Sequence, residues 1–223
     1  MPNTHTTPLV SVLMPAYNHA PYVRAAVESV LGQTYGNLEL IAIDDASPDA
    51  TWTVLQSFED ARLRRYRHDA NRGAHATLNE ALGMARGEFV AIINSDDVFA
   101  PGRIAACLET LHDTGADLVG SDIVLIDAAG EPLVEHWWVR AFSDLKRVWI
   151  ETGDWHATML HGNVFMTTSN CVFRRSWLEA VGDFRDLRYV LDYEWLLRGL
   201  IRDRRLAWLD APLLHYRLHE RNT

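Results

Sequence analysis

Cysteine, lysine and long apolar runs are scarce in this sequence of 223 residues. Cys107 and Cys171 are the only cysteines and are not spaced as C-x-x-C, so the sequence predicts neither a disulfide framework nor a zinc cluster. No stretch reaches the ~18 consecutive apolar residues that cross a bilayer, and residues 1–8 lack the basic and apolar segments of a signal peptide. These absences predict a cytoplasmic protein with both cysteines in its core.

The charge balance is acidic, with Lys146 as the single lysine. The 21 lysines and arginines stand against 30 acids, which gives a formal net charge of -9. Because a phosphate backbone is bound by basic surfaces, nucleic acid is not expected as a partner. An anionic small ligand remains compatible if a bound metal supplies local positive charge. The motifs G-x-G-x-x-G and G-x-x-x-x-G-K-[ST] are absent, which argues against a dinucleotide or P-loop site.

Strand and helix patterns alternate through the first half of the chain. Strands are expected at 9–14, 38–43, 63–67 and 89–93, with helices at 21–32, 50–58, 74–86 and 103–113. Since parallel strands need crossover connections, this α/β alternation predicts a mostly parallel sheet with helices on both faces. Farther along we expect strands at 117–127, 164–173 and 206–209, a hairpin partner at 132–139, and a short helix at 177–181.

Two of the expected strands run directly into paired acids. Asp44 and Asp45 follow one strand, and Asp96 and Asp97 follow another. Open α/β sheets bind ligands at the carboxyl ends of their strands, and a divalent cation relieves the repulsion between neighbouring carboxylates. The alternative is that these acids belong to turns that cap the following helices.

Tryptophans concentrate between residues 136 and 156, where periodicity is weak. This region is expected to be built partly from loops. Its tryptophans either stack on the flat face of a sugar or another organic acceptor, or fill a small second core. Farther on, Asp192 begins a helical pattern in which Trp195 would face the core. The Asp192 carboxylate therefore either caps that helix or points into a cleft.

Five segments, in this order, resemble the inverting family 2 glycosyltransferases, which have the GT-A fold, a Rossmann-like, mostly parallel sheet with a smaller acceptor-side region. They are residues 12–18 (VLMPAYN), 43–49 (IDDASPD), 71–73 (NRG), 93–97 (INSDD), and 173–195 from FRR through GDF to DYEW. The closing YRLH of residues 216–219, with Asn222, fits as well. Each segment alone is weakly specific, whereas the ordered set is highly specific.

The resemblance implies a nucleotide-sugar donor, with a UDP-sugar as the first expectation. Pro15, Ala16 and Tyr17 would line the nucleotide pocket, and Asp44 or Asp45 would accept a hydrogen bond from the base. The other donor-binding residues that it implies are Asn18, Arg72, Gly73, Asn94, Ser95 and Asp96.

The resemblance also implies a Mn²⁺ or Mg²⁺ cofactor, held by Asp96, Asp97 and His219, although His219 could equally be a surface histidine. The family often has aspartate where this chain has Asn94, whose amide oxygen can coordinate a metal but carries no charge. Asp192 matches the general base that deprotonates the acceptor hydroxyl, so that the sugar is transferred with inversion in a single displacement.

We expect one glycosyltransferase domain at 8–223 behind a flexible N-terminus at 1–7. Residues 8–100 would bind the nucleotide sugar, and residues 101–223 would bind the acceptor and supply the base. The expected acceptor is a saccharide or a lipid-linked saccharide of polysaccharide, glycolipid or cell-envelope assembly, with peripheral contact at the inner face of the membrane. The Q-x-x-R-W signature is absent after Asp192, which favours transfer of a single sugar.

Two other functions stay open at this point. One is a non-catalytic binding or scaffold domain of a larger glycosyltransferase, and the abrupt end at Thr223 leaves open that the chain is one piece of a longer protein. The other is a sugar nucleotidyltransferase, although the glycine-rich basic loop of those enzymes is missing after the first strand. The oligomeric state, the sugar and the acceptor are not determined by the sequence.

Overall fold

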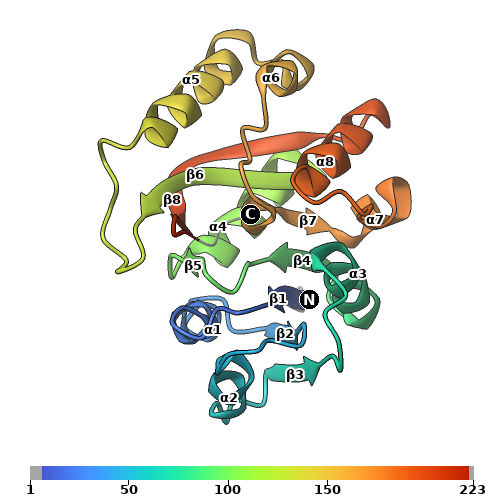
Figure 1. The fold of residues 1–223 in the computed structure, drawn as a ribbon. Helices are drawn as coiled ribbons and strands as arrows, with labels where there is room; N and C mark the ends of the chain where they lie inside the picture. Colours follow the sequence, from blue (N-terminus) through green and yellow to red (C-terminus); the bar gives the residue numbers. More distant parts are fainter. Residues whose placement is uncertain (1–6, 221–223) are drawn as a thin grey trace.

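The computed structural model describes residues 7–220, in which eight strands form a single sheet (Figure 1). The strands are β1 (Val10–Ala16), β2 (Leu38–Asp44), β3 (Leu63–Arg67), β4 (Phe89–Ile92), β5 (Val98–Phe99), β6 (Leu118–Ile126), β7 (Val172–Arg174) and β8 (Leu206–Arg217). The expectations for residues 1–6 and for Asn222 lie outside the described residues.

The sheet runs in the order β3-β2-β1-β4-β7-β6-β8-β5. Its first four strands are parallel, β7 is antiparallel to both of its neighbours, and β6 and β8 are parallel to each other. The prediction of a mostly parallel sheet is therefore confirmed. Because β2, β1 and β4 are adjacent and parallel, their carboxyl ends meet at one edge.

Helices cover both faces of this sheet (Figure 1). They are α1 (Val23–Leu31), α2 (Thr51–Gln56), α3 (Ala74–Met84), α4 (Arg103–Thr114), α5 (Trp137–Thr152), α6 (Trp155–His161), α7 (Arg175–Val181) and α8 (Leu191–Ile201), with a 3₁₀ turn at Thr168–Asn170. Within the described part of the chain, no helix is both long enough and apolar enough to cross a membrane.

Successive residues of a central strand enter two different cores, because side chains alternate across a sheet. Val12 and Met14 of β1 belong to the core beneath α1, α2 and α4, whereas Leu13 belongs to the core beneath α3, α7 and α8. Both β1 and β2 are therefore buried on both faces, and most of their residues are apolar, which is why these strands appear in the sequence as largely apolar runs.

The tryptophan-rich region is almost entirely helical, with α5 and α6 separated by only two residues, so the expectation that it is built partly from loops was wrong. Only Pro132 makes the expected hairpin bridge, to Ile126, and α5 begins at Trp137. None of the α5 residues is fully buried, although Phe142 and Leu145 pack against the core beneath α8. The apolar residues of α5 do recur at helical spacing, at Trp138, Phe142, Leu145 and Trp149, so the sequence carried the pattern of an amphipathic helix.

The strand expected at 164–173 is shorter than predicted and begins at Val172. The polar side chains of the 3₁₀ turn before it bond to other segments instead of lying in the sheet: Asn170, for example, donates to the Ser121 backbone oxygen at 2.9 Å. In contrast, β8 extends to Arg217, well past the expected Leu209, with a register irregularity around Pro212. The irregularity accommodates a residue that lacks an N–H group.

Candidate active site

A cavity of about 910 Å³ opens at the carboxyl edge of β1, β2 and β4. Both halves of the chain contribute to it, Tyr17 and Asp45 from the first half and Asp192 from the second. The sequence-predicted residues that line it are Pro15, Ala16, Tyr17, Asp45, Arg72, Gly73, Asn94, Asp96 and Asp192. The structure thus brings together, in one cavity, residues that lie up to 177 positions apart (15 to 192).

Asp44 and Asp45 have different environments although they are adjacent. The Asp45 carboxylate accepts from the backbone N–H groups of Arg72 and Gly73, each at 2.8 Å, and lies 2.7 Å from His68 Nδ1. Asp44 is fully buried, pairs with Arg67 at 3.0 Å and does not line the cavity. Of the two predicted base-binding acids, only Asp45 is therefore positioned to face a ligand.

The turn after β4 separates its two acids in the same way. Asp97 is fully buried, and its carboxylate accepts from the Ser169 hydroxyl at 2.5 Å and from the Arg217 N–H at 2.9 Å. Burial, and then the nearby charge of Asp96, raise the pKa of Asp97 well above its ordinary value. Asp96 lines the cavity instead, so it is the acid that can meet a ligand.

Asn94 is held on both sides of its amide. Its Nδ2 donates to Thr167 Oγ1 at 2.9 Å, and its Oδ1 accepts from Thr168 Oγ1 at 3.0 Å. The side chain of Ser95 is buried, and its hydroxyl lies 2.8 Å from His19 Nδ1. Asn18 lies beside the cavity, in the left-handed region at φ 57°, where its N–H donates to Ser47 Oγ at 2.9 Å. These three residues shape the edge of the site through the protein's own hydrogen bonds.

Two histidines flank Asp96. His219 Nε2 lies 3.0 Å from Asp96 Oδ2, and His19 Nε2 lies 3.7 Å from the same oxygen. His219 was predicted from the sequence, whereas His19 was missed. The available signal was its position just after β1, whose carboxyl end shares an edge with the turn that carries Asp96.

The fit of a divalent ion can be tested on these three groups. The ligand atoms of His19, Asp96 and His219 lie within 4.8 Å of one another. An ion bound at about 2.0–2.2 Å keeps its ligand atoms within about 4.4 Å of one another, so small side-chain rotations would bring them into place. Two imidazoles and a carboxylate are also ordinary ligands of first-row metals. The residues present fit the implied metal.

Asp192 lies in the first turn of α8, where the chain enters the cavity. Its carboxylate accepts from the Tyr193 N–H at 2.8 Å and from Asn163 Nδ2 at 3.0 Å. Burial raises the pKa of Asp192 to about 6, and these hydrogen bonds oppose the rise. A carboxylate with a pKa near neutrality, facing a cavity, is suited to accept a proton. Asn163 was not predicted, because no local pattern ties it to a residue 29 positions away.

The tryptophans of residues 136–156 divide between the two roles that the sequence left open. Trp138 lines the cavity, whereas Trp137 does not and is 63% exposed. Trp149 and Trp155 stack at 4.0 Å, and the Trp155 indole N–H donates to the Leu206 backbone oxygen. Trp138 therefore fits the expectation of stacking on an acceptor, and the Trp149–Trp155 pair fits the expectation of a small second core.

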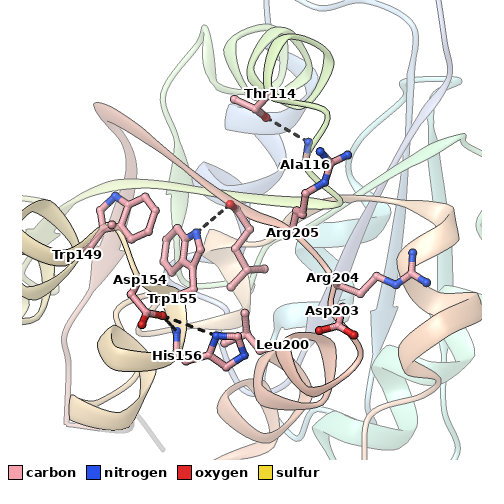
Figure 2. A pocket seen from close by; sticks show the side chains of 12 residues that line it. Thr114, Ala116, Trp149, Asp154, Trp155, His156, Leu200, Asp203, Arg204 and Arg205 are labelled. Atoms are coloured by element: carbon pink, nitrogen blue, oxygen red, sulfur yellow. Dashed lines mark hydrogen bonds and ion pairs between the residues drawn. The ribbon is translucent and has the colours of Figure 1, made fainter.

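That pair borders a second hollow of about 530 Å³, beside the first residues of β6 and β8 (Figure 2). Two of its charged groups are engaged in the fold: Asp154 caps α6 through the His156 N–H, and the Arg205 guanidinium donates to the Gly115 backbone oxygen. It holds none of the sequence-predicted site residues. The larger cavity is the candidate active site.

Comparison with known proteins decides the family. The model of glycosyl transferase family 2 matches residues 11–182, which include all but the first residue of β1, both acidic turns and α7. The chain belongs to glycosyl transferase family 2. A Bacillus subtilis (strain 168) protein, EpsH, whose name places it among glycosyltransferases, is 31% identical over 220 residues, which cover 96% of this chain and 62% of EpsH.

Another relative, with a more specific name, is WfaP of Escherichia coli, a UDP-Glc:alpha-D-GlcNAc-diphosphoundecaprenol beta-1,3-glucosyltransferase. It is 38% identical over 97 residues, which cover 44% of this chain and 39% of WfaP. This chain spans less than two thirds of the length of either relative.

Solved structures share the fold. TarS 1–349 of S. aureus, in complex with UDP-GlcNAc, superposes with a TM-score of 0.74 at 19% identity and covers 96% of this chain and 59% of its own. The mannosyltransferase PcManGT of Pyrobaculum calidifontis, in complex with GDP-Man and Mn²⁺, has a TM-score of 0.72 at 22% identity, over 98% of this chain and 59% of its own. The expected GT-A architecture of this family 2 member is confirmed.

Proposed function

We propose that this chain transfers one sugar from a nucleotide-sugar donor to an acceptor hydroxyl, with inversion at the anomeric carbon and with a divalent ion at Asp96. The observation that carries the proposal is that Asp192, whose pKa is about 6, lines the same cavity as Asp45 and Asp96. A proton acceptor and the candidate donor-binding groups thus share one site. The match to family 2 supports the same reaction class.

The donor would lie along the edge formed by residues 8–100. Its base and ribose would rest beside Tyr17 and Asp45, and the Arg72–Gly73 backbone is fixed beside them by the Asp45 carboxylate. Its diphosphate would lie near Asp96 and His219. When bound there, Mn²⁺ or Mg²⁺ supplies positive charge against the leaving diphosphate. Among structural neighbours, TarS binds UDP-GlcNAc, and PcManGT binds GDP-Man with Mn²⁺, so both nucleotides are candidates.

The acceptor would enter from residues 101–223. Asp192 takes the proton from the acceptor hydroxyl, whose oxygen attacks the anomeric carbon. The bond between that carbon and the diphosphate oxygen breaks at the same time, and its electron pair stays on the diphosphate. Since base and leaving group lie on opposite sides of the sugar, the configuration inverts. Asn163 holds the carboxylate that receives the proton.

The acceptor is proposed to be a saccharide, either free or lipid-linked. Trp138 offers an aromatic surface in the same cavity, which suits the apolar face of a pyranose ring. The relative WfaP acts, by its name, on a diphosphoundecaprenol-linked sugar, which supports a lipid-linked acceptor at a membrane surface.

The test is nucleotide-sugar consumption by the purified chain, together with calorimetric titration of UDP, GDP and dTDP with and without Mn²⁺. We expect Asp192→Asn to keep nucleotide binding and to lose about 10²–10⁴-fold in turnover, the usual contribution of a positioned base. Asp113→Asn, a substitution on the exposed surface of α4, is the matched control and should leave turnover unchanged.

Two results would contradict the proposal. Wild-type turnover in Asp192→Asn would remove the base from the mechanism. If the wild-type chain bound nucleotide but consumed no nucleotide sugar with any acceptor or ion, the non-catalytic scaffold function would replace the transferase.

A further inference from the structure

Three side chains from separate segments converge beside the cavity. His19 follows β1, Asp96 lies in the turn after β4, and His219 follows β8. Their ligand-capable atoms lie within 4.8 Å of one another. Asp96 Oδ2 is the common point, at 3.0 Å from His219 Nε2 and 3.7 Å from His19 Nε2. The group therefore has the N, O, N composition of a two-histidine, one-carboxylate metal centre.

The orientation of His19 is fixed from two sides. Its backbone N–H donates to Thr51 Oγ1 at 2.9 Å, and its Nδ1 lies 2.8 Å from Ser95 Oγ. With the proton on Nδ1, the ring donates to Ser95 and its Nε2 lone pair faces Asp96. A metal-binding imidazole is oriented in this way when its other ring nitrogen donates a hydrogen bond.

His219 is fixed by stacking. Its ring lies parallel to that of Tyr22, at 4.8 Å and 26°, and Tyr22 in turn lies under the Arg217 guanidinium at 5.0 Å. The side chains of His19, Asp96 and His219 are 18%, 8% and 4% exposed. All three groups are thus ordered and largely shielded from water in the protein itself.

We propose that His19 is a third metal-binding side chain, so that the centre binds its divalent ion before, and independently of, the nucleotide. The proposal rests on the proposed function in that the ion is the one at Asp96 facing the donor diphosphate. A hard cation held by one or two carboxylates depends on substrate phosphates for its remaining ligands. Three preoriented protein ligands remove that dependence, because little side-chain freedom is lost on binding.

The ligand set also determines which ion is preferred. Imidazole nitrogen suits first-row transition ions, whereas Mg²⁺ prefers oxygen ligands. With two imidazoles and one carboxylate, the centre should retain Mn²⁺ or Co²⁺ against an excess of Mg²⁺. An alternative role for His19 is a hydrogen bond to the donor diphosphate. In that case, replacing His19 would not change the affinity for the metal measured without nucleotide.

The experiment is Mn²⁺ titration of the full chain without nucleotide. Binding is detected by calorimetry and by the electron paramagnetic resonance signal of free Mn²⁺. We expect the wild type to bind one ion. The Kd for Mn²⁺ should be at least about tenfold higher in His19→Gln. It should rise by a similar factor in Ser95→Ala, which keeps the His19 imidazole but removes the hydroxyl beside its Nδ1. His75→Gln is the matched control, because His75 lines the same cavity but pairs with Asp186 at 3.2 Å. Its Kd should equal that of the wild type.

Mg²⁺ competition forms the second arm. The Mg²⁺ concentration needed to displace Mn²⁺ should fall in His19→Gln relative to the wild type. Equal Mn²⁺ affinity in the wild type and His19→Gln would overturn the proposal, as would Mn²⁺ binding that appears only after nucleotide is added. In the latter case the proposed transferase would stand, since its own test is nucleotide-sugar consumption. Coincident thermal unfolding curves for the variants would exclude misfolding as the cause of a loss.

Discussion

Asn163 Nδ2 donates a hydrogen bond to Asp192 Oδ2 at 3.0 Å, and this contact connects the loop before β7 to the start of α8. The other end of the Asn163 amide accepts from the Phe165 N–H at 3.1 Å, so the side chain cannot rotate without losing both bonds. The same loop continues to Thr167 and Thr168, which hold Asn94 beside Asp96. One loop therefore positions both the candidate base and the candidate metal-binding turn.

Removing the Asn163 amide should change the pH dependence of transfer. The hydrogen bond favours the charged form of Asp192, so Asn163→Ala raises the pKa of Asp192 above about 6. The acidic limb of the kcat/KM profile should move to higher pH by about one to two pH units, the value of a hydrogen bond to a charged group. Asn79→Ala, which loses two comparable hydrogen bonds to Phe184, is the control and should leave the profile in place. A shared shift in both variants would show a general structural effect.

The ionised carboxylate of Asp192 should lower the free energy of unfolding at neutral pH. Burial raises its pKa from 3.8 to about 6, so the folded state binds the proton more tightly than the unfolded state. The resulting stability is present below about pH 3.8, is lost as pH rises through 6, and is absent above. Asp192→Asn should therefore be more stable than the wild type at pH 7.5, by up to about 3 kcal/mol, with the difference shrinking toward pH 4. Urea denaturation at several pH values measures this difference, and an equal difference at every pH would refute it.

Trp138 should affect the acceptor and not the donor. It lines the cavity, whereas Trp137, which stacks on it at 4.6 Å, does not. We expect Trp138→Ala to raise the acceptor KM about tenfold, the value of an aromatic contact plus lost buried area, with the donor KM unchanged. Trp137→Ala should change the acceptor KM by less than about threefold, because Trp137 contacts the Trp138 ring and does not line the cavity. Initial-rate kinetics with each substrate varied in turn separates the two, and a raised donor KM in Trp138→Ala would argue against the assignment.

Two helical glycines should respond oppositely to alanine. A Cβ on Gly199 of α8 would lie 2.0 Å from the buried Trp177 ring, so Gly199→Ala should destabilise the fold by about 1–3 kcal/mol or more. A Cβ on Gly83 of α3 would meet nothing within 4 Å, so Gly83→Ala should stabilise it by up to about 1 kcal/mol. Chemical denaturation of the two variants tests this pair. Equal effects would mean that α8 does not pack on α7 as described.

The family and most of the fold could be predicted from the sequence. The runs Val10–Ala16 and Leu38–Asp44 are buried and mostly apolar because helices cover both sides of the sheet, and such runs can be recognised locally. The helix α5 was missed although its apolar residues recur at helical spacing, at Trp138, Phe142, Leu145 and Trp149, so the pattern was present in the sequence but was not interpreted as a helix. The strand predicted at 164–173 was too long. The polar residues before Val172 form hydrogen bonds with Asn94 and Ser121, and those partners lie far away in the sequence.

The sequence by itself determined which residues follow the strand ends, and therefore that acids gather at one edge of the sheet. Only the tertiary structure decided which acid of each pair faces the cavity. Asp45 and Asp96 line it, whereas Asp44 and Asp97 are buried against Arg67 and Ser169. Neighbouring residues at a turn point in different directions, and the direction depends on partners that the fold supplies. In the same way, His19 and His219 are 200 positions apart in the sequence. They lie side by side only because β8 pairs with β6 in the sheet and brings the residues that follow it to this edge.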